Sequence, residues 1–551
     1  MDFSITHVKH EQALDYLRSI NRDNPPSPKE LSEQLLTTIN EEILSINATM
    51  AKGETKHKLL RLLEPPELAE IVKHLYSVKL ISWTDNPQDS NPMLAVYCED
   101  GLNKGIYVEA DQYLPKVLLQ YNHELTEREM KNIYFILKAE LPIESICRNK
   151  NLVAVNNGIF DYQKKLLLPF SPDYIFMSKS RVNFNIKAKN VTIHNPEDNT
   201  DWDVESWMNS LSDDPAIVAL LWQVLGAIIR PNVRWNKSVW LYSEQGNNGK
   251  GTLCELMRNL LGQGTYAAIP ISSFAKEFML EPLIKASAII VDENNVGGFV
   301  DSLANFKAVV TNDVIQLNRK HKAPIDFQFR GLVVECINDL PKIKDKSDSF
   351  LRRLLFVPMT KCFTGKERPY IKNDYLHRQY VLEYVLKKVL LDTNFYQLSE
   401  PDACVMLLNT YRAYNNPTED FWLEFKNQFQ WDMLPYDFLY ELYKAYIRET
   451  NPHSSVSGKN TFLKDLRAVI LRDRNWVDVP NSRKRGNHMM EYEPLINDFN
   501  LTKMRNPSLH FNCTPGSYLI PPKEAEEKTF RCFIRTQPRR DGFVKESSYK
   551  A

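Results

Sequence analysis

The sequence lacks several features that mark whole classes of protein. Its eight cysteines are scattered without a C-x-x-C pair, which argues against a zinc ribbon and, in a chain of 551 residues, against a disulfide framework. It has no run of about 18 apolar residues, so we expect no membrane span, and its N-terminal segment has no apolar core of signal-peptide length. Glycine is scarce, at 18 residues, and there is no internal repeat. These absences predict an intracellular, cytoplasmic protein in a reducing compartment.

A net charge is missing as well. The 69 Lys and Arg residues are balanced by 69 Asp and Glu residues. The charges are unevenly distributed, because residues 451–551 contain 18 basic and 11 acidic side chains, an excess of seven positive charges. This excess favours an anionic partner for the C-terminal part, although a solvated basic surface would have the same composition.

The length and the changes of hydrophobic period predict a multidomain α/β protein. Apolar residues recur at helical spacing in an N-terminal helical region, residues 1–75, whereas residues 76–203 mix strand-like and helical spacing and are interpreted as an α+β collar or connector domain. Residues 204–375 alternate helices with apolar strands, which is typical of a parallel sheet buried by helices. A helical linker at 376–420 and a C-terminal domain of short helices and late strands at 421–551 follow.

The segment after the apolar run SVWLY (238–242) has the pattern of a phosphate-binding loop. It reads SEQGNNGKGT and leads into a predicted helix, so backbone amides, a lysine and a helix N-terminus could bind a polyphosphate. The usual pattern has Gly in place of Glu244 and a hydroxyl residue in place of Gly251, so a loop that only joins a strand to a helix remains an alternative. The candidate nucleotide-binding residues are Gly246, Asn247, Asn248, Gly249, Lys250, Gly251 and Thr252.

Two further apolar strands end in polar residues. ASAIIVDEN ends in Asp292 and Glu293, which could hold Mg²⁺ through one carboxylate and polarise water with the other. GLVVECIND ends in Asn338, a candidate sensor of the attacking water or the γ-phosphate, although Asn at a strand end is often a turn residue. Placed after a phosphate loop in one α/β unit, these residues predict a nucleotide triphosphatase site.

Two basic clusters are candidates for longer-range contacts. Arg352 and Arg353 precede an apolar run, and one of them could reach the γ-phosphate bound by a neighbouring subunit; a surface salt bridge is the alternative. Lys320, His321 and Lys322 lie at the tip of a predicted hairpin, which could contact phosphates of single-stranded DNA or could merely be solvated.

The D-x-D sequence at 201–203 is a possible polymerase motif. It opens a helix after a polar run, so an acidic turn that caps the helix is the favoured interpretation. Primase activity is therefore not predicted.

The order of SEQGNNGKGT, IIVDEN, NRKHKAP, VECINDLP and FLRRLL resembles that of superfamily 3 helicases, particularly the phage and poxvirus-type primase-helicases. The resemblance covers roughly residues 90–375, and the overall layout is similar to that of replication initiator helicases of staphylococcal pathogenicity islands. It implies an AAA+ fold, a homo-hexameric ring, ATP with Mg²⁺, and translocation along single-stranded DNA. By position it implies Lys250 and Thr252 as ligands of phosphate and Mg²⁺, Asp292 as metal ligand, Glu293 as catalytic base and Asn338 as sensor.

The same resemblance suggests roles for the basic clusters. Lys320 and His321 match the basic pair on the DNA-binding hairpin of papillomavirus-type helicases. For the arginine finger it favours Arg353, because the arginine-then-strand pattern follows this residue; Arg352 remains open.

The C-terminal part resembles a winged helix, in which the second helix of a helix-turn-helix enters the major groove. Phe462, Leu466, Val469 and Ile470 form the apolar face of that helix. A solvated helix in a packing module is the alternative. The candidate DNA contacts are Lys459, Lys464 and Arg467 on the helix, and Arg483, Lys484 and Arg485 in a basic turn between the strands WVDV and MMEY.

Together these features predict an ATP-dependent DNA helicase and replication initiator of a mobile element. Its expected partners are single-stranded DNA, duplex origin DNA, further copies of the chain and host replication proteins. A switch or remodelling ATPase without unwinding activity would share the phosphate site. A DNA-binding initiator without motor activity would share the C-terminal domain.

Overall fold

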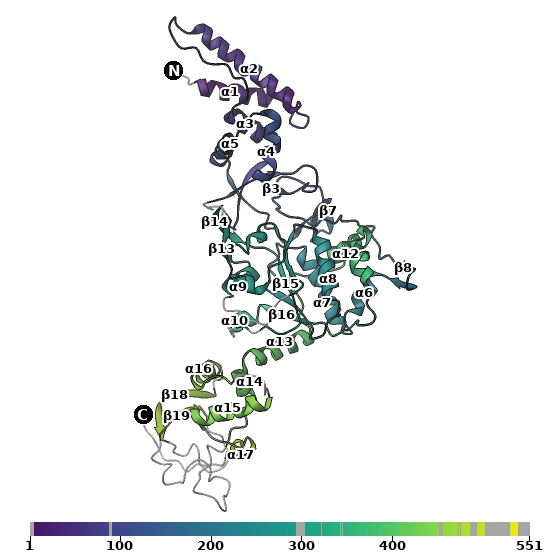
Figure 1. Cartoon of the computed structure of the whole chain (residues 1–551), viewed down its shortest axis with the longest axis vertical. Helices are drawn as coiled ribbons and strands as arrows, with labels where there is room; N and C mark the ends of the chain where they lie inside the picture. Colours follow the sequence, from purple (N-terminus) through teal and green to yellow (C-terminus); the bar gives the residue numbers. More distant parts are fainter. Residues whose placement is uncertain are drawn as a thin grey trace, which may run out of the picture. The chain divides into compact units, whose positions relative to one another are not determined.

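A computed structural model shows two compact units, Met1–Leu408 and Asn409–Ala551 (Figure 1). The division falls within the segment that the sequence assigns to a helical linker, inside helix α13 (Asp402–Asn415). Among the described helices, none has both the length and the apolar composition needed to cross a bilayer. The structure describes residues 5–86, 91–293, 303–320, 322–341, 343, 345, 347–450, 456–471, 473, 475–484, 493–501 and 529–537.

The first unit begins with three helices, α1 (Ile5–Ser19), α2 (Pro28–Thr49) and α3 (Pro65–Leu75). Helix α2 starts at Pro28 because Ser27 and Glu30 form a capping box, in which each side chain accepts a hydrogen bond from the other's backbone N–H. The apolar faces of these helices share one core with helices α4 (Ala110–Tyr121) and α5 (Glu127–Glu140).

Small sheets connect these helices to the rest of the first unit. A four-stranded sheet has the order β3-β2-β1-β4, a three-stranded sheet the order β5-β6-β7, and β8 and β9 form a two-stranded sheet. The strands are β1 (Val78–Ser82), β2 (Met93–Tyr97), β3 (Tyr107–Glu109), β4 (Ile143–Ser145), β5 (Leu152–Val155), β6 (Gly158–Asp161), β7 (Leu166–Leu168), β8 (Ile193–Asn195) and β9 (Thr200–Trp202).

A five-stranded parallel sheet forms the centre of the first unit. Its order is β11-β12-β15-β10-β16, and the strands are β10 (Ser238–Tyr242), β11 (Tyr266–Ala267), β12 (Ala288–Val291), β15 (Leu332–Ile337) and β16 (Leu354–Pro358). Both faces of the sheet are buried, which explains why its strands read as continuous apolar runs.

Different helices cover the two faces. Alternate strand residues such as Val239 and Val334 share a core with α7 (Pro215–Ile228), α8 (Lys250–Leu261) and α12 (Gln379–Leu391). On the other face, Trp240 and Phe356 pack among aromatic rings from α9 (Ala304–Thr311) and α10 (Asp348–Leu351). A helix α6 (Val204–Ser210) precedes α7.

The topology brings the strand ends together. After β10 the chain passes to the far edge at β11, returns through β12 and β15, and then crosses to β16 on the other side. Because all five strands are parallel, their carboxyl ends lie at one edge, and the strand order reverses at β10. Open α/β sheets bind ligands at such a reversal.

A hairpin of β13 (Val314–Arg319) and β14 (Lys322–Gln328) is inserted between β12 and β15 in the sequence. It packs on the segment around Trp83: the backbone N–H of Gln328 donates to the Trp83 carbonyl at 3.1 Å, and Phe327 contacts the Trp83 ring. The hairpin that the sequence predicts is therefore present.

The second unit combines helices with a three-stranded antiparallel sheet of order β17-β19-β18. Its helices α14 (Pro417–Phe425), α15 (Tyr436–Thr450) and α16 (Lys459–Ile470) enclose an aromatic core, and α16 buries Phe462, Leu466, Val469 and Ile470 as predicted. The other elements are β17 (Met433–Pro435), β18 (Trp476–Lys484), α17 (Leu495–Asp498) and β19 (Thr529–Arg535).

The strand predicted at WVDV is present. These residues lie in β18 and pair with β19, with Val477 opposite Ile534 and Val479 opposite Cys532. Strand β19 supplies buried residues, Cys532 and Phe533, to the core of the unit. Strand β18 lies at an edge of the described sheet, so its predicted pairing with MMEY stays a prediction. The MMEY segment lies outside the described residues.

Candidate nucleotide-binding site

The loop between β10 and α8 has a specific, glycine-dependent shape. Asn247 and Gly249 both have positive φ, at 53° and 84°. A Cβ atom on Gly249 would also lie 2.7 Å from Leu211 Cδ2, so only glycine fits there without rearrangement. The buried Asn248 fixes the loop from inside, since its Nδ2 donates to the Gln245 carbonyl and its Oδ1 accepts from the Lys250 N–H.

Lys250 is the first residue of α8 and points along the carboxyl edge of the sheet. Its Nζ donates to Asn338 Oδ1 at 2.7 Å and to the Ser243 carbonyl at 3.3 Å. The residue is 7% exposed, and this burial lowers the pKa of its ammonium group, an effect that the thiol of Cys336 and the carboxylate of Asp292 partly oppose. A buried ammonium group with no carboxylate within ion-pair distance in the described structure is well suited to an incoming anion.

Asp292 follows β12 and faces the start of α8. A Cβ atom on Gly251 would lie only 3.2 Å from Asp292 Oδ1. Gly251, which departs from the usual phosphate-loop pattern, thus lets the helix approach the carboxylate closely. Arg258 Nη1 lies 3.7 Å from Asp292 Oδ2 on the same side. The half-buried Thr252 is the hydroxyl residue nearest in sequence to Lys250 on α8.

The sheet edge therefore gathers side chains from separate strand ends. Lys250 follows β10, Asp292 follows β12 and Asn338 follows β15, and Asn338 contacts Lys250 directly. Glu293 is exposed beside Asp292.

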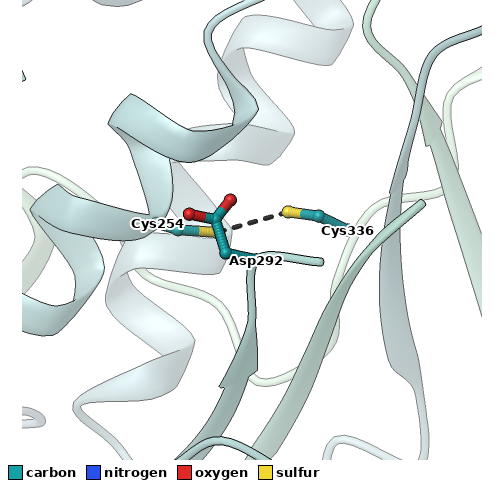
Figure 2. Close-up of side chains that lie close together, drawn as sticks. All are labelled: Cys254, Asp292 and Cys336. Atoms are coloured by element: carbon teal, nitrogen blue, oxygen red, sulfur yellow. Dashed lines mark hydrogen bonds between the residues drawn. The ribbon is translucent and has the colours of Figure 1, made fainter. Parts of the chain in front are cut away.

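Two cysteines that sequence reasoning missed lie directly below this edge (Figure 2). Cys254 on α8 and Cys336 on β15 are buried, with their Sγ atoms 3.3 Å apart. The hydrogen bond with Cys254 and the burial raise the pKa of the Cys336 thiol. A sequence signal exists, because Cys254 is four residues after Lys250 on a helix and Cys336 is two before Asn338 on a strand, so each shares a face with a predicted site residue.

A cavity of about 630 Å³ adjoins the loop at Asn247, Gly249 and Thr252. A lining segment at Phe363 is held to the loop, since the Phe363 N–H donates to the Asn247 carbonyl at 2.7 Å. The volume of the cavity is typical of small-molecule sites. Aromatic, aliphatic and basic residues contribute to its lining, namely Trp207, Phe363, Ile371, Lys366, Arg368 and Lys372.

Arg352 and Arg353 lie at the opposite edge of the sheet. They precede β16, whose first residue Leu354 pairs with Ser238 at the start of β10. Five strand residues span about 16 Å, so neither arginine belongs to the phosphate-loop edge of its own chain. Arg353 donates from Nη1 to the Ser349 hydroxyl at 2.8 Å, whereas Arg352 is exposed.

The predicted DNA-binding residues of the hairpin differ in their surroundings. Lys320 is exposed at the tip, and His321 lies outside the described residues. Lys322 Nζ is instead 3.4 Å from Asp111 and 3.7 Å from Glu109, so its charge is partly neutralised.

In the second unit, most predicted DNA contacts on α16 serve the unit itself. Lys459 forms an ion pair with Asp437, and Arg467 donates to Asp478 at 2.8 Å and to the Tyr436 hydroxyl at 3.3 Å. Lys464 is exposed. The side chains of Arg483 and Lys484, on β18, and all of Arg485 lie outside the described structure.

In the D-x-D sequence, Asp203 caps a helix, as predicted, whereas Asp201 lies in β9. The carboxylate of Asp203 accepts hydrogen bonds from the Ser206 N–H at 2.9 Å and the Ser206 hydroxyl at 2.6 Å, at the start of α6. Asp201 contacts His194 at 2.8 Å.

Comparison with known proteins gives three family matches along the chain. Residues 97–213 match a family described as D5 N terminal like, and residues 413–500 match one described as Poxvirus D5 protein-like. Two segments of the chain are thus similar to D5 families. Each unit contributes one, which confirms the expected relationship to poxvirus-type D5 proteins at this level. Residues 241–353, which include the loop between β10 and α8, match a family of unknown function, DUF5906. No curated protein matches the chain.

Solved structures of the apo C-terminal region of NrS-1 are also similar to the chain. An A-form structure has 11% identity and a TM-score of 0.40, with 86% of this chain and 100% of the other covered. A second structure, of residues 305–718, has 12% identity and a TM-score of 0.43, with 77% and 97% covered. Likeness at this level does not carry a function from one protein to the other.

Proposed function

We propose that this chain is an ATP-dependent DNA helicase and replication initiator, with an AAA+ motor of the superfamily 3 type in residues 204–375. The observation that supports this most is the convergence of Lys250, Asn338 and Asp292 at the carboxyl edge of one parallel sheet, beside a cavity of about 630 Å³. The two D5-type regions support a role in nucleic-acid replication.

The loop geometry supports ATP binding. The polyphosphate would accept hydrogen bonds from backbone N–H groups between Gly246 and Gly251, at the positive end of α8. It would also replace Asn338 Oδ1 as the partner of the Lys250 ammonium, which frees the Asn338 amide to contact the γ-phosphate or the attacking water. The adjacent cavity offers room for the nucleoside.

Mg²⁺ fits the oxygen donors at this edge. The hydroxyl of Thr252 and the carboxylate of Asp292 are ligands of the kind that Mg²⁺ prefers, and the bound ion would neutralise charge on the β- and γ-phosphates. Glu293, exposed beside Asp292, is the proposed base that polarises the attacking water.

The arginine finger must come from another copy of the chain. Arg352 and Arg353 are at the edge of the sheet opposite the phosphate loop, so either could act only across a subunit interface of a ring such as a hexamer. The side-chain environment favours Arg352, which is exposed, over Arg353, which already donates to Ser349.

DNA contacts are proposed for both units. Lys320, with His321, would touch single-stranded DNA from the hairpin tip. In the second unit, the succession of helices α14, α15 and α16 with a three-stranded antiparallel sheet supports a winged helix, in which exposed Lys464 would face the origin duplex. Host replication proteins are proposed partners of an initiator carried by a mobile element.

One observation favours a second candidate, a switch ATPase that does not unwind DNA. Lys322 is paired with Glu109 and Asp111, and Gln328 binds the backbone near Trp83, so the hairpin also serves as a packing element within the first unit. In such a protein the hairpin would transmit the nucleotide state and would not touch DNA.

Unwinding of a forked duplex by the full chain with ATP and Mg²⁺ tests the proposal, with the Lys250→Ala variant in parallel. The helicase requires ATP-dependent strand separation that this variant lacks, together with hydrolysis stimulated by single-stranded DNA. Hydrolysis without unwinding or stimulation would favour the switch ATPase. Origin binding that survives without any hydrolysis in the native protein would favour an initiator that lacks a motor.

A further inference from the structure

The cluster of Cys254, Asp292 and Cys336 brings three metal-ligating atoms together (Figure 2). They come from α8, the end of β12 and β15, and the two sulfur atoms and a carboxylate oxygen all lie within 4.8 Å of one another. Thiols inside a sheet core often serve only as small apolar groups. Here the third member is a carboxylate that opens toward solvent, so packing alone does not account for the set.

The distances suit a zinc-like ion after a small adjustment. Tetrahedral zinc binds sulfur at about 2.3 Å and carboxylate oxygen at about 2.0–2.2 Å, which places two ligating sulfurs about 3.8 Å apart. The Sγ atoms of Cys254 and Cys336 are 3.3 Å apart. A separation larger by about 0.5 Å would therefore complete the geometry, and a side-chain rotation can supply it.

The donor set separates this site from the proposed Mg²⁺ site. Mg²⁺ takes oxygen ligands in octahedral geometry, whereas two thiolates and one carboxylate favour Zn²⁺, Cd²⁺ or Co²⁺. The Asp292 side chain is 29% exposed, which gives an ion a route in, and the two cysteines are buried behind it. A fourth position stays open to water or to a phosphate oxygen.

The local charges are compatible with a bound cation. Arg258 lies 3.7 Å from Asp292, and Lys250 is on α8, four residues before Cys254. With both cysteines deprotonated, the three ligands carry three negative charges, which outnumber the two neighbouring positive charges. The Lys250 ammonium donates to Asn338 and to the Ser243 carbonyl, two neutral groups.

We propose that Cys254, Cys336 and Asp292 bind a thiophilic divalent ion of the Zn²⁺ class. Because Asp292 then becomes a ligand of this ion, it is withdrawn from Mg²⁺, and occupancy slows ATP hydrolysis. The inhibitory part rests on the proposed function, whereas metal binding itself does not.

Binding is tested on the full chain, freed of metal with a chelator, kept reduced by a phosphine and titrated with Co²⁺ or Cd²⁺ in the absence of nucleotide. The native chain should develop a thiolate-to-metal charge-transfer band that saturates at one ion per chain, and Zn²⁺ should displace the probe. Cys254→Ser and Cys336→Ser should abolish the band. Cys98→Ser is the matched control, since it changes another buried cysteine of the first unit, and it should keep the full band.

Folding is checked separately, because substitutions in the sheet core can destabilise it. Circular dichroism establishes that each variant is folded, and Asp292→Asn, at a partly exposed position, should bind the probe at least about 10-fold more weakly while it keeps a thiolate band. No thiolate band in the folded native chain overturns the proposal. So does an equal band in the folded Cys254→Ser,Cys336→Ser double variant.

Inhibition is a separate measurement. Zn²⁺ added at fixed Mg²⁺ and ATP should lower hydrolysis by the native chain, a chelator should restore it, and the double cysteine variant should be insensitive. Native hydrolysis that Zn²⁺ leaves unchanged, despite a saturated band, overturns the inhibitory part. A charge-transfer band without any ATP hydrolysis would support the metal site and refute the ATPase proposal. ATP hydrolysis without a charge-transfer band would support the ATPase proposal and refute the metal site.

Discussion

The parallel sheet of the first unit and the second unit use their charged residues in different ways. At the carboxyl edge of the parallel sheet, Lys250, Asn338 and Asp292 come from different strand ends and face a common space beside a cavity. In the second unit, Lys459 and Arg467 form ion pairs with Asp437 and Asp478 and so join elements of their own fold.

The difference has a topological origin. In a parallel sheet, the carboxyl ends of all the strands lie at the same edge, so polar motifs that follow the strands predict a shared site. A basic residue on a helix has no such constraint, because a nearby acidic residue can bind it as well as a phosphate can. Strand-end motifs are therefore stronger indicators of a site than basic helix faces.

The sharpest test of the sheet edge is Lys250→Ala against Glu293→Gln. Both should abolish hydrolysis, but only the lysine variant should lose nucleotide binding, because in the proposed mechanism the lysine binds phosphate whereas Glu293 acts on water. Phosphate release and binding of a fluorescent ATP analogue measure the two effects, with exposed Lys276→Ala as the control. Equal loss of nucleotide binding in both variants would contradict the separate roles.

The opposite edge is tested by Arg352→Ala and Arg353→Ala. The finger variant should bind ATP normally and lose about 10³–10⁵-fold in hydrolysis. We expect this of Arg352→Ala, while Arg353→Ala mainly loses the contact with Ser349. Mixing the finger variant with Lys250→Ala protein should restore some activity, since a mixed ring contains intact interfaces. If no mixing ratio gives rescue, the finger is not supplied in trans.

The hairpin tip offers a matched pair, Lys320→Ala and Lys322→Ala. Loss of the exposed Lys320 should reduce DNA stimulation and lower the slope of log affinity against log salt by about 1, whereas Lys322 is already paired with Glu109 and Asp111. Basal hydrolysis should stay near normal in both. Similar DNA binding by the native chain and Lys320→Ala would show that this lysine does not contact DNA.

In the second unit, Arg467→Ala should act on stability and Lys464→Ala on DNA. Arg467 is partly exposed and bonds Asp478 and Tyr436, so its loss should cost about 1–2 kcal/mol, seen as a lower urea midpoint for this unit. Lys464→Ala should leave the midpoint unchanged and relax base preference in a selection from random duplexes. If Arg467→Ala leaves stability unchanged and alters base preference, Arg467 contacts DNA and the expected role in stability is wrong.

The smallest effect is expected for Asp203→Ala. It removes the cap of α6 and should cost about 1 kcal/mol of stability. Hydrolysis by the folded variant should be near normal, and nucleotide polymerisation should be absent from both proteins. Polymerisation by the native chain that disappears in the variant would show that the cap interpretation is incomplete.

The sequence by itself determined the elements whose cause is local. The loop before α8, the polar residues at the ends of β12 and β15, the apolar face of α16 and the cap at Asp203 could all be recognised, because each depends on neighbouring residues. Hydrophobic period and turn chemistry act over a few residues, so they can be read without knowledge of the fold.

Only the tertiary structure decided which distant residues meet. The contact of Cys254 with Cys336 joins residues 82 positions apart, the pairing of β18 with β19 joins two distant segments, and Gly251 lies close to the carboxylate of Asp292. The same holds for Arg352 and Arg353, whose distance from the phosphate loop follows from the register of β16 with β10. Strand order and register are set by the packing of the whole sheet, and no local pattern contains them.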